Sequence, residues 1–270
     1  MKIKLKALFC GLCALGFLNS CSTYLTPASP GSNLGYLPKA MVVDSIKTLT
    51  SISASLAGGS SPDAKVSYEM GMINISAAHT FKEFNIGYGL FGYTGKAENS
   101  STTNSLKYPE DYLPQFKKNY FGAGLRFSAG LHSTSENGNT DFRYINFENA
   151  VNFENGPYTD FRRQIYRGFV PNYVAVTDRS LIWTTGLSSE IIWRGRRNHD
   201  IKHAFRLFIG GSPTLNNGFR FGSNVSREKD VSSGGWVVNY FLNVKRFYMS
   251  LEMASTLNYS QKISLGYTFK

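Results

Sequence analysis

The chain has 270 residues, a formal net charge of +11, 17% charged residues and 14% aromatic residues. This length allows one or two domains with a sizeable core, and the composition argues against disorder and against a helical bundle. The three cysteines, Cys10, Cys13 and Cys21, all lie at the N-terminal end. Their position excludes a disulfide framework, a cysteine zinc site and a cysteine nucleophile from the rest of the chain.

The N-terminus has the layout of a signal peptide. Lys2, Lys4 and Lys6 precede an apolar stretch at residues 7–20. That stretch is shorter than the roughly 20 residues that a membrane-spanning helix needs, so the pattern predicts a cleaved signal peptide over residues 1–20.

The end of this stretch, Leu18-Asn19-Ser20-Cys21, resembles the lipobox of bacterial lipoproteins. The resemblance implies that Cys21 is acylated; an ordinary secretory signal with an incidental cysteine is the alternative. Ser22, in place of an acidic residue, favours by the same resemblance an outer-membrane anchor, which we expect on the periplasmic side. Residues 21–44 contain three prolines and predict a lipidated N-terminus followed by an extended tether.

The remaining residues, 45–270, alternate with a period of two. In residues 120–132, Phe121, Leu125 and Phe127 share one face, while the other face is mostly glycine with single polar residues. Such alternation is typical of strands with one apolar face. It predicts ten strands, with eight as an alternative, at residues 49–57, 65–78, 83–94, 120–132, 166–177, 181–194, 201–211, 235–244, 247–258 and 262–269.

The second face of these strands decides between a soluble sandwich and a membrane barrel. A sandwich would carry Lys, Glu and Thr on its solvated face, but here that face is mostly Gly, Ser, Ala and Asn. Trp183 and Trp193 share a face ten residues apart, or roughly 23 Å along a tilted strand, close to the ~25 Å apolar band between aromatic girdles. The fold class expected is all-β, an antiparallel transmembrane β-barrel, with both tryptophans at the membrane interfaces.

The lengths of the connections predict an orientation. Residues 79–82, 195–200 and 244–247 are expected to be short periplasmic turns, and residues 95–119 and 212–234 external loops. Residues 133–165 would be a long periplasmic connection that breaks this rule. Its apolar content predicts either a partner-docking segment or a plug beneath the barrel. The aromatic residues of this segment considered for docking are Phe142, Tyr144, Phe147, Phe153, Tyr158 and Phe161.

Seven charged residues are expected to face the barrel interior. An interior ion-pair network that closes the lumen is favoured over an ion-selective pore, because unpaired charges in a narrow lumen are costly. The seven residues are Glu69, Arg126, Glu190, Arg194, Lys202, Arg206 and Glu252.

Few residues suggest chemistry. His132 begins a tract that resembles the His-x-Ser-Asn element of lipid A deacylases, but Thr134 stands where the serine is expected. Neither catalysis nor a cofactor is therefore predicted, and the histidines lack metal-ligand spacing. The positive charge is scattered over an exported chain, so outer-membrane lipids and lipopolysaccharide are expected as partners and nucleic acid is not.

From the lipobox through Tyr24 and the proline-containing tether to the glycine-rich and tyrosine-rich hairpins, the chain resembles the lipid-anchored outer-membrane β-barrel proteins of Bacteroidota. The resemblance implies a non-enzymatic structural or accessory subunit of an outer-membrane secretion or assembly complex. It therefore implies other outer-membrane or periplasmic proteins as partners. A small porin and a lipid A deacylase-like enzyme are the alternatives.

Overall fold

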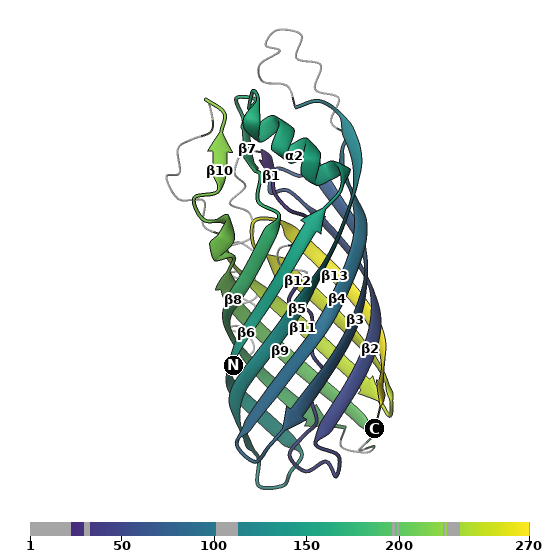
Figure 1. The fold of residues 1–270 in the computed structure, drawn as a ribbon. Helices are drawn as coiled ribbons and strands as arrows, with labels where there is room; N and C mark the ends of the chain where they lie inside the picture. Colours follow the sequence, from purple (N-terminus) through teal and green to yellow (C-terminus); the bar gives the residue numbers. More distant parts are fainter. Residues whose placement is uncertain are drawn as a thin grey trace, which may run out of the picture.

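Ten antiparallel strands form a closed ring (Figure 1). The computed structural model describes residues 23–29, 33–100, 113–195, 198, 200–223, 225 and 233–269. Each strand of the ring pairs with the next one in chain order, and the last strand pairs with the first. The strands are β2 (Thr48–Ser60), β3 (Val66–Thr80), β4 (Phe84–Asn99), β5 (Phe116–Thr134), β6 (Thr140–Asn155), β8 (Leu181–Arg194), β9 (Ile201–Gly211), β11 (Gly234–Val244), β12 (Phe247–Ser255) and β13 (Tyr259–Phe269).

The predicted ten-strand barrel is confirmed and the eight-strand alternative is wrong, but one of the ten strands is not the one expected. The predicted strand at residues 166–177 is not part of the ring, where β6 takes its place. Pairing along β6 shifts between Arg143 and Asn146, and the neighbouring side chains of Tyr144 and Ile145 both point outward. This bulge moves the apolar residues from even to odd positions, so a search for unbroken alternation misses the strand.

The barrel has two different ends. At the end called here the turn end, residues 81–83, 135–139, 195–200 and 245–246 join the strands. At the opposite end, called the loop end, the connections include residues 100–115, 156–180 and 212–233. The predicted long connection at residues 133–165 is therefore wrong, because most of it is β6. Long loops lie at one end and short turns at the other.

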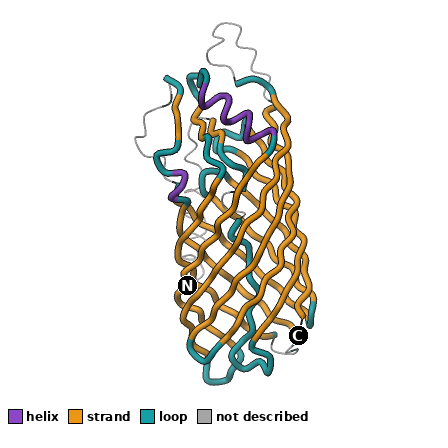
Figure 2. Tube along the Cα trace, in the orientation of Figure 1, coloured by secondary structure: helices purple, strands orange, loops and turns teal. Residues whose placement is uncertain are grey.

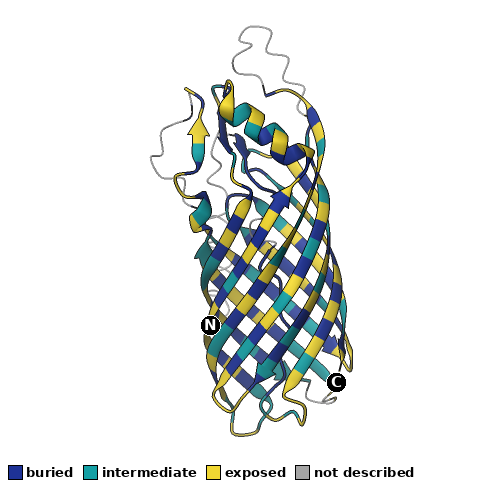
Figure 3. Cartoon of the chain, viewed as in Figure 1, coloured by how far each residue is buried: buried dark blue, intermediate teal, exposed yellow. Residues whose placement is uncertain are grey.

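The outer face of the ring is apolar. Leu56, Leu125, Leu187 and Leu265 expose between 51% and 70% of their surface. Figure 3 shows buried or half-buried residues alternating with exposed ones along the strands of the ring that face the viewer. A closed ring leaves no unpaired strand edge, and an apolar outer surface is suited to lipid rather than water. The architecture is that of an outer-membrane β-barrel.

A small cap covers the loop end (Figure 1). It contains the helix α2 (Pro157–Arg167), the 3-10 helix η3 (Pro213–Leu215) and a sheet of β1 (Thr23–Leu25), β7 (Val174–Thr177) and β10 (Phe219–Phe221). Arg162 of α2 is fully buried and donates to the carbonyl oxygen of Thr177 at 2.7 Å and to Glu154 of β6 at 3.1 Å. This side chain ties the cap to the barrel wall. Among the described residues, no helix is long and apolar enough to cross a membrane.

Candidate functional site: the barrel lumen

The N-terminal part of the described chain, residues 23–29 and 33–41, is called here the luminal segment. It begins with β1 in the cap, and the rest of it lies in the lumen. Leu25, Leu34 and Met41 are at most 2% exposed, and each belongs to a different buried apolar cluster of the interior. Figure 2 shows part of this segment as a teal trace among the orange strands. The predicted extended tether is therefore wrong for these residues, because they are buried in the cap and inside the barrel.

The luminal segment begins among residues of the loop end. The hydroxyl group of Tyr158, on α2, donates to the carbonyl oxygen of Thr26 at 2.9 Å. The amide of Ala28 donates to the carboxylate of Glu154 at 2.9 Å. Glu154 lies next to the last residue of β6, so this end of the segment is fixed to both the cap and the rim of the barrel.

Further along, Asn33 connects the segment to several strands. Its side-chain amide donates to Asn152 of β6 at 3.0 Å and to Thr184 of β8 at 2.9 Å. The backbone carbonyl oxygen of Asn33 accepts from the Nε atom of Arg126, on β5. Gly35 has a positive φ of 41°, and a Cβ atom there would overlap the Arg126 guanidinium. Glycine is therefore needed where the segment passes this side chain.

The next part of the segment is held by charged side chains. Glu190 of β8 accepts from the hydroxyl group of Tyr36 and from Lys39 Nζ, the latter at 2.9 Å. The Nη2 atom of Arg143 donates to the carbonyl oxygen of Ala40 at 2.7 Å. All five residues are at most 8% exposed, so these bonds are shielded from bulk water.

The chain then reaches the turn end at residues 42–47, which lead into β2. Asp44 forms ion pairs with Arg194, the last residue of β8, and with Lys202, near the start of β9. The amide of Val42 donates to Asp141 of β6 at 3.0 Å. Burial acts to raise the pKa of Asp44, but Lys202, the Met41 amide and Arg194 outweigh it and hold that pKa below its usual value.

The order of these contacts shows that the segment runs the length of the barrel. Along β8, which descends from the loop end to the turn end, successive residues meet successive parts of the segment. The pairs are Thr184 with Asn33, Glu190 with Lys39, and Arg194 with Asp44. The segment therefore passes from one end of the lumen to the other.

A chain that crosses the lumen outside the strand ladder needs partners for its backbone polar groups, since buried unpaired groups are costly. Side chains of the wall supply several of them. The pairs are the Ala28 amide with Glu154, the Asn33 carbonyl with Arg126, the Ala40 carbonyl with Thr80 and Arg143, and the Val42 amide with Asp141. The polar wall is thus complementary to the segment.

The wall also contains ion pairs of its own. Arg206 of β9 binds both carboxylate oxygens of Glu148 on β6, and Lys262 of β13 lies 2.7 Å from Glu252 of β12. Asn239 connects the two pairs, because it accepts from Arg206 and donates to Glu252 at 2.6 Å. A single network thus links β6, β9, β11, β12 and β13 across the interior.

Six of the seven charges predicted to be interior do face inward, although Arg194 and Lys202 lie near the turn-end rim. Glu69 does not, since it is exposed on the outer side of β3. The inward positions around it are Tyr68, Met70 and Met72, which pack into the apolar cluster beneath the cap. Near the loop end the inward face of β3 is apolar, so the rule that polar residues face the lumen gives the wrong side for Glu69.

Other interior charges were not predicted from the sequence. Those on β6 were assigned to a loop, those before β2 were assigned to the tether, and Lys262 lies on a predicted strand but was not assigned to the interior. Opposite charges at facing positions of adjacent strands were the signal for Lys262, which pairs in register with Glu252. The missed residues that the structure places in the lumen or at its turn-end rim are Lys39, Asp44, Asp141, Arg143, Glu148, Glu154 and Lys262.

The predicted docking aromatics have different surroundings from those expected. Phe142, Tyr144, Phe147 and Phe153 are on the outward face of β6, each 45–55% exposed. Tyr158 is buried, and Phe161 packs against the cluster beneath the cap. Their apolar character is explained by the membrane-facing surface and the cap, so the argument for a docking loop no longer applies.

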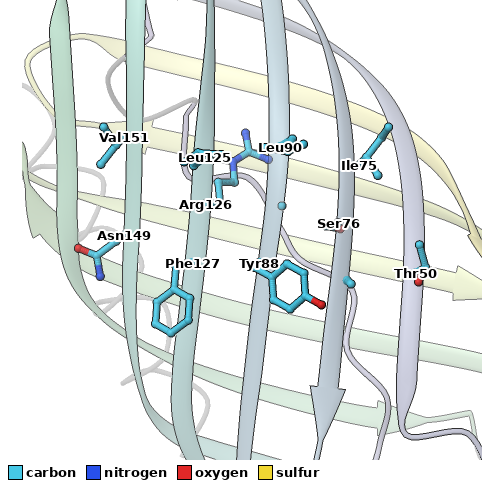
Figure 4. A pocket seen from close by; sticks show the side chains of 12 residues that line it. Thr50, Ile75, Ser76, Tyr88, Leu90, Leu125, Arg126, Phe127, Asn149 and Val151 are labelled. Carbon is cyan, nitrogen blue, oxygen red and sulfur yellow. The ribbon is translucent and has the colours of Figure 1, made fainter.

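Trp183 and Trp193 lie on the same strand, β8, ten residues apart, as predicted. Trp183 lies on the outward face of β8, and Trp193 stacks on His203 of β9 with ring centroids 5.3 Å apart. Their location at the membrane interfaces stays a prediction. Elsewhere on the barrel wall, a mostly apolar hollow on strands β2 to β6 is lined by Tyr88, Leu90 and Phe127, among others (Figure 4). It belongs to the membrane-facing surface.

His132 is a buried residue near the turn end of β5, with one ring nitrogen 3.2 Å from the carbonyl oxygen of Phe84. Ser135 instead bonds to Asn137 in the following turn. Among the described residues, no group of three or more His, Cys, Asp or Glu side chains could hold a metal ion. Cys21 and the signal peptide predicted at residues 1–20 lie outside the described residues.

The fold and lumen define an outer-membrane β-barrel that holds part of its own chain inside. No protein-family model and no curated protein match the chain. Among solved structures, the translocator domain of the autotransporter NalP from Neisseria meningitidis is similar over 82% of this chain and 88% of that one, with 7% identity and a TM-score of 0.44. The β domain of the Bordetella autotransporter BrkA covers 83% and 98% of the two chains, with 9% identity and a TM-score of 0.40. A mutant of the monoaromatic hydrocarbon channel TodX covers 91% and 73%, with 10% identity and a TM-score of 0.36. The function is therefore argued from the chain's own residues.

Asp44 gives the barrel a testable pH dependence. Because its folded pKa is lowered, its contribution to stability is fully present above its unfolded pKa of about 4 and is lost as pH falls through the folded pKa. We expect Asp44→Asn to lower the temperature at which the folded band disappears on electrophoresis near pH 7, and the difference from the parent to shrink as the pH falls below about 4.

The matched control is Asp160→Asn, which removes an exposed carboxylate of α2 paired with Arg163. It should change little at either pH. A difference between Asp44→Asn and the parent that stays constant from neutral to acid pH would show that the Asp44 ion pairs do not stabilise the barrel.

Proposed function

We propose that the protein is a non-enzymatic, lipid-anchored barrel that serves as a structural or accessory subunit of an outer-membrane secretion or assembly complex. The observation that carries the proposal is the luminal segment, which fills the interior from end to end. A barrel filled in this way is suited to hold a surface in place at the membrane rather than to pass solutes.

The cap offers the partner surface in this proposal. Phe169 exposes 65% of its surface, Tyr173 40% and Phe221 38%. They lie on the connections and strands above the loop end rather than on the barrel wall. Exposed aromatic side chains on a rigid support are typical of protein contacts. We therefore propose a protein partner that binds the cap, while lipids and lipopolysaccharide surround the wall.

The alternatives have less support. A small porin requires an open lumen, and here the wall charges bind the luminal segment or one another. An enzyme resembling the lipid A deacylases requires a serine within reach of His132, whereas the described partner of that ring is a backbone carbonyl oxygen. We therefore propose no catalytic role for His132.

Conductance distinguishes a closed barrel from a porin. The parent protein should show no steady conductance in a planar bilayer, because the luminal segment occupies the pore. A variant whose mature chain begins at Ser45 lacks the segment and should conduct. If that variant fails to fold, Lys39→Met should open intermittently, since breaking a buried ion pair costs about 3 kcal/mol or more.

The control for the second variant is Lys117→Met, which removes an exposed pair with Glu98 on the barrel wall. It should stay closed. Steady conductance of the parent protein, equal to that of the shortened chain, would favour the porin and overturn the closed barrel.

Copurification tests the accessory role. Phe169→Ser combined with Phe221→Ser should abolish recovery of partner proteins in mild detergent while the heat-sensitive folded band is retained. Val43→Ser is the matched control, because Val43 is a 47% exposed apolar residue at the turn end. Equal recovery of partners with parent, cap variant and control would remove the cap as the partner surface, and the absence of any partner would overturn the accessory role.

A further inference from the structure

The described chain begins at the loop end, opposite to the C-terminus. The backbone amide of Thr23 donates to the carbonyl oxygen of Tyr173 at 2.9 Å, and β1 pairs in parallel with β7. The Thr23 hydroxyl donates to Asp63 in the connection from β2 to β3. Phe269, at the end of β13, and Thr48, at the start of β2, lie at the turn end (Figure 1). The luminal segment thus places the two ends of the described chain, Thr23 and Phe269, at opposite ends of the barrel.

The lengths of the connections orient this arrangement in the membrane. Bacterial barrels of a single chain have short periplasmic turns and longer external loops. The loop end, with the cap and the connections at residues 100–115, 156–180 and 212–233, is therefore the external end. Thr23 lies on this side.

We infer that the chain enters the lumen from the external side of the membrane, so that the N-terminal end of the described chain, at Thr23, lies on the cell-surface side of the barrel. This inference rests on the occupied lumen of the proposed function, and it is independent of the accessory role and of whether the barrel conducts.

The contacts in the lumen also constrain how such a topology arises. The segment is surrounded by buried side chains, including Arg126, Arg143 and Glu190, which are at most 5% exposed. A packed interior leaves no room for the N-terminal end to be drawn through after closure. We therefore expect the ring to close around the segment, with the N-terminal end already on the outer side. The barrel in this way delivers its own N-terminus to the cell surface.

Epitope accessibility on intact cells tests the inference. One variant carries an epitope between Ser22 and Thr23, a second carries it after Asn217 in the loop-end cap, and a third after Asn137 in the turn at residues 135–139. Antibody should bind the first and second variants on intact cells. It should bind the third only after the outer membrane is permeabilised.

Each other outcome has a definite meaning. If the first epitope stays hidden on intact cells while the second is exposed, or becomes accessible only when the third does, the N-terminal end does not leave at the external end and the inference is wrong. If the first and second are both hidden while the third is exposed, the segment crosses the barrel but its external exit is refuted. Surface exposure of the first epitope together with conductance of the parent protein would retain the inference and reject the closed barrel, so the two failures are distinguishable.

Discussion

The central physical constraint is that a closed barrel encloses a polar interior that must be filled. Ten strands pair completely with one another, so their backbone groups are satisfied within the ring. The segment inside has no such ladder over residues 33–41, and its polar groups depend on side chains of the wall. Arg126, Arg143 and Glu190 each contact it, and each is buried. The composition of the wall follows from this requirement.

The same requirement explains why so many charges are present in a narrow space. Arg206 with Glu148 and Lys262 with Glu252 are buried pairs, and the loss of one partner from such a pair is strongly destabilising. Arg126 has no carboxylate within ion-pair distance among the described residues; it donates instead to Asn74 at 2.7 Å and lies 4.2 Å from the centre of the Phe91 ring. Arg126 also contacts the Asn33 backbone carbonyl and packs against Gly35, so it is part of the wall that holds the luminal segment.

Sequence periodicity predicted most strands of the barrel wall, because the alternation of inward and outward residues along a strand is a local property. The strands at residues 181–194 and 201–211 were predicted with the bounds that the structure has. The β6 strand was missed where a bulge changes the phase of the alternation, and Glu69 was misplaced where the interior becomes apolar beneath the cap.

The luminal segment could not be recognised in the same way. Its prolines and lack of periodicity are typical of a tether in water as well as of a chain held inside a barrel. Asn33 and Asn152, which are in direct contact, are 119 positions apart in the sequence. Such contacts depend on closure of the ring, so no local pattern encodes them.

The most direct test of the account is chemical cross-linking between the luminal segment and the wall. In a chain with Asn33→Cys and Asn152→Cys, a short thiol-to-thiol cross-linker should join the two cysteines in the folded barrel and change its mobility after unfolding. The single variants control for reaction at Cys21, and Asn33→Cys with Asn243→Cys, which is near the turn end of β11, is the distance control. Cross-linking to position 152 but not to position 243 is the predicted result. No cross-link to position 152 in a barrel that is otherwise folded would contradict the occupied lumen.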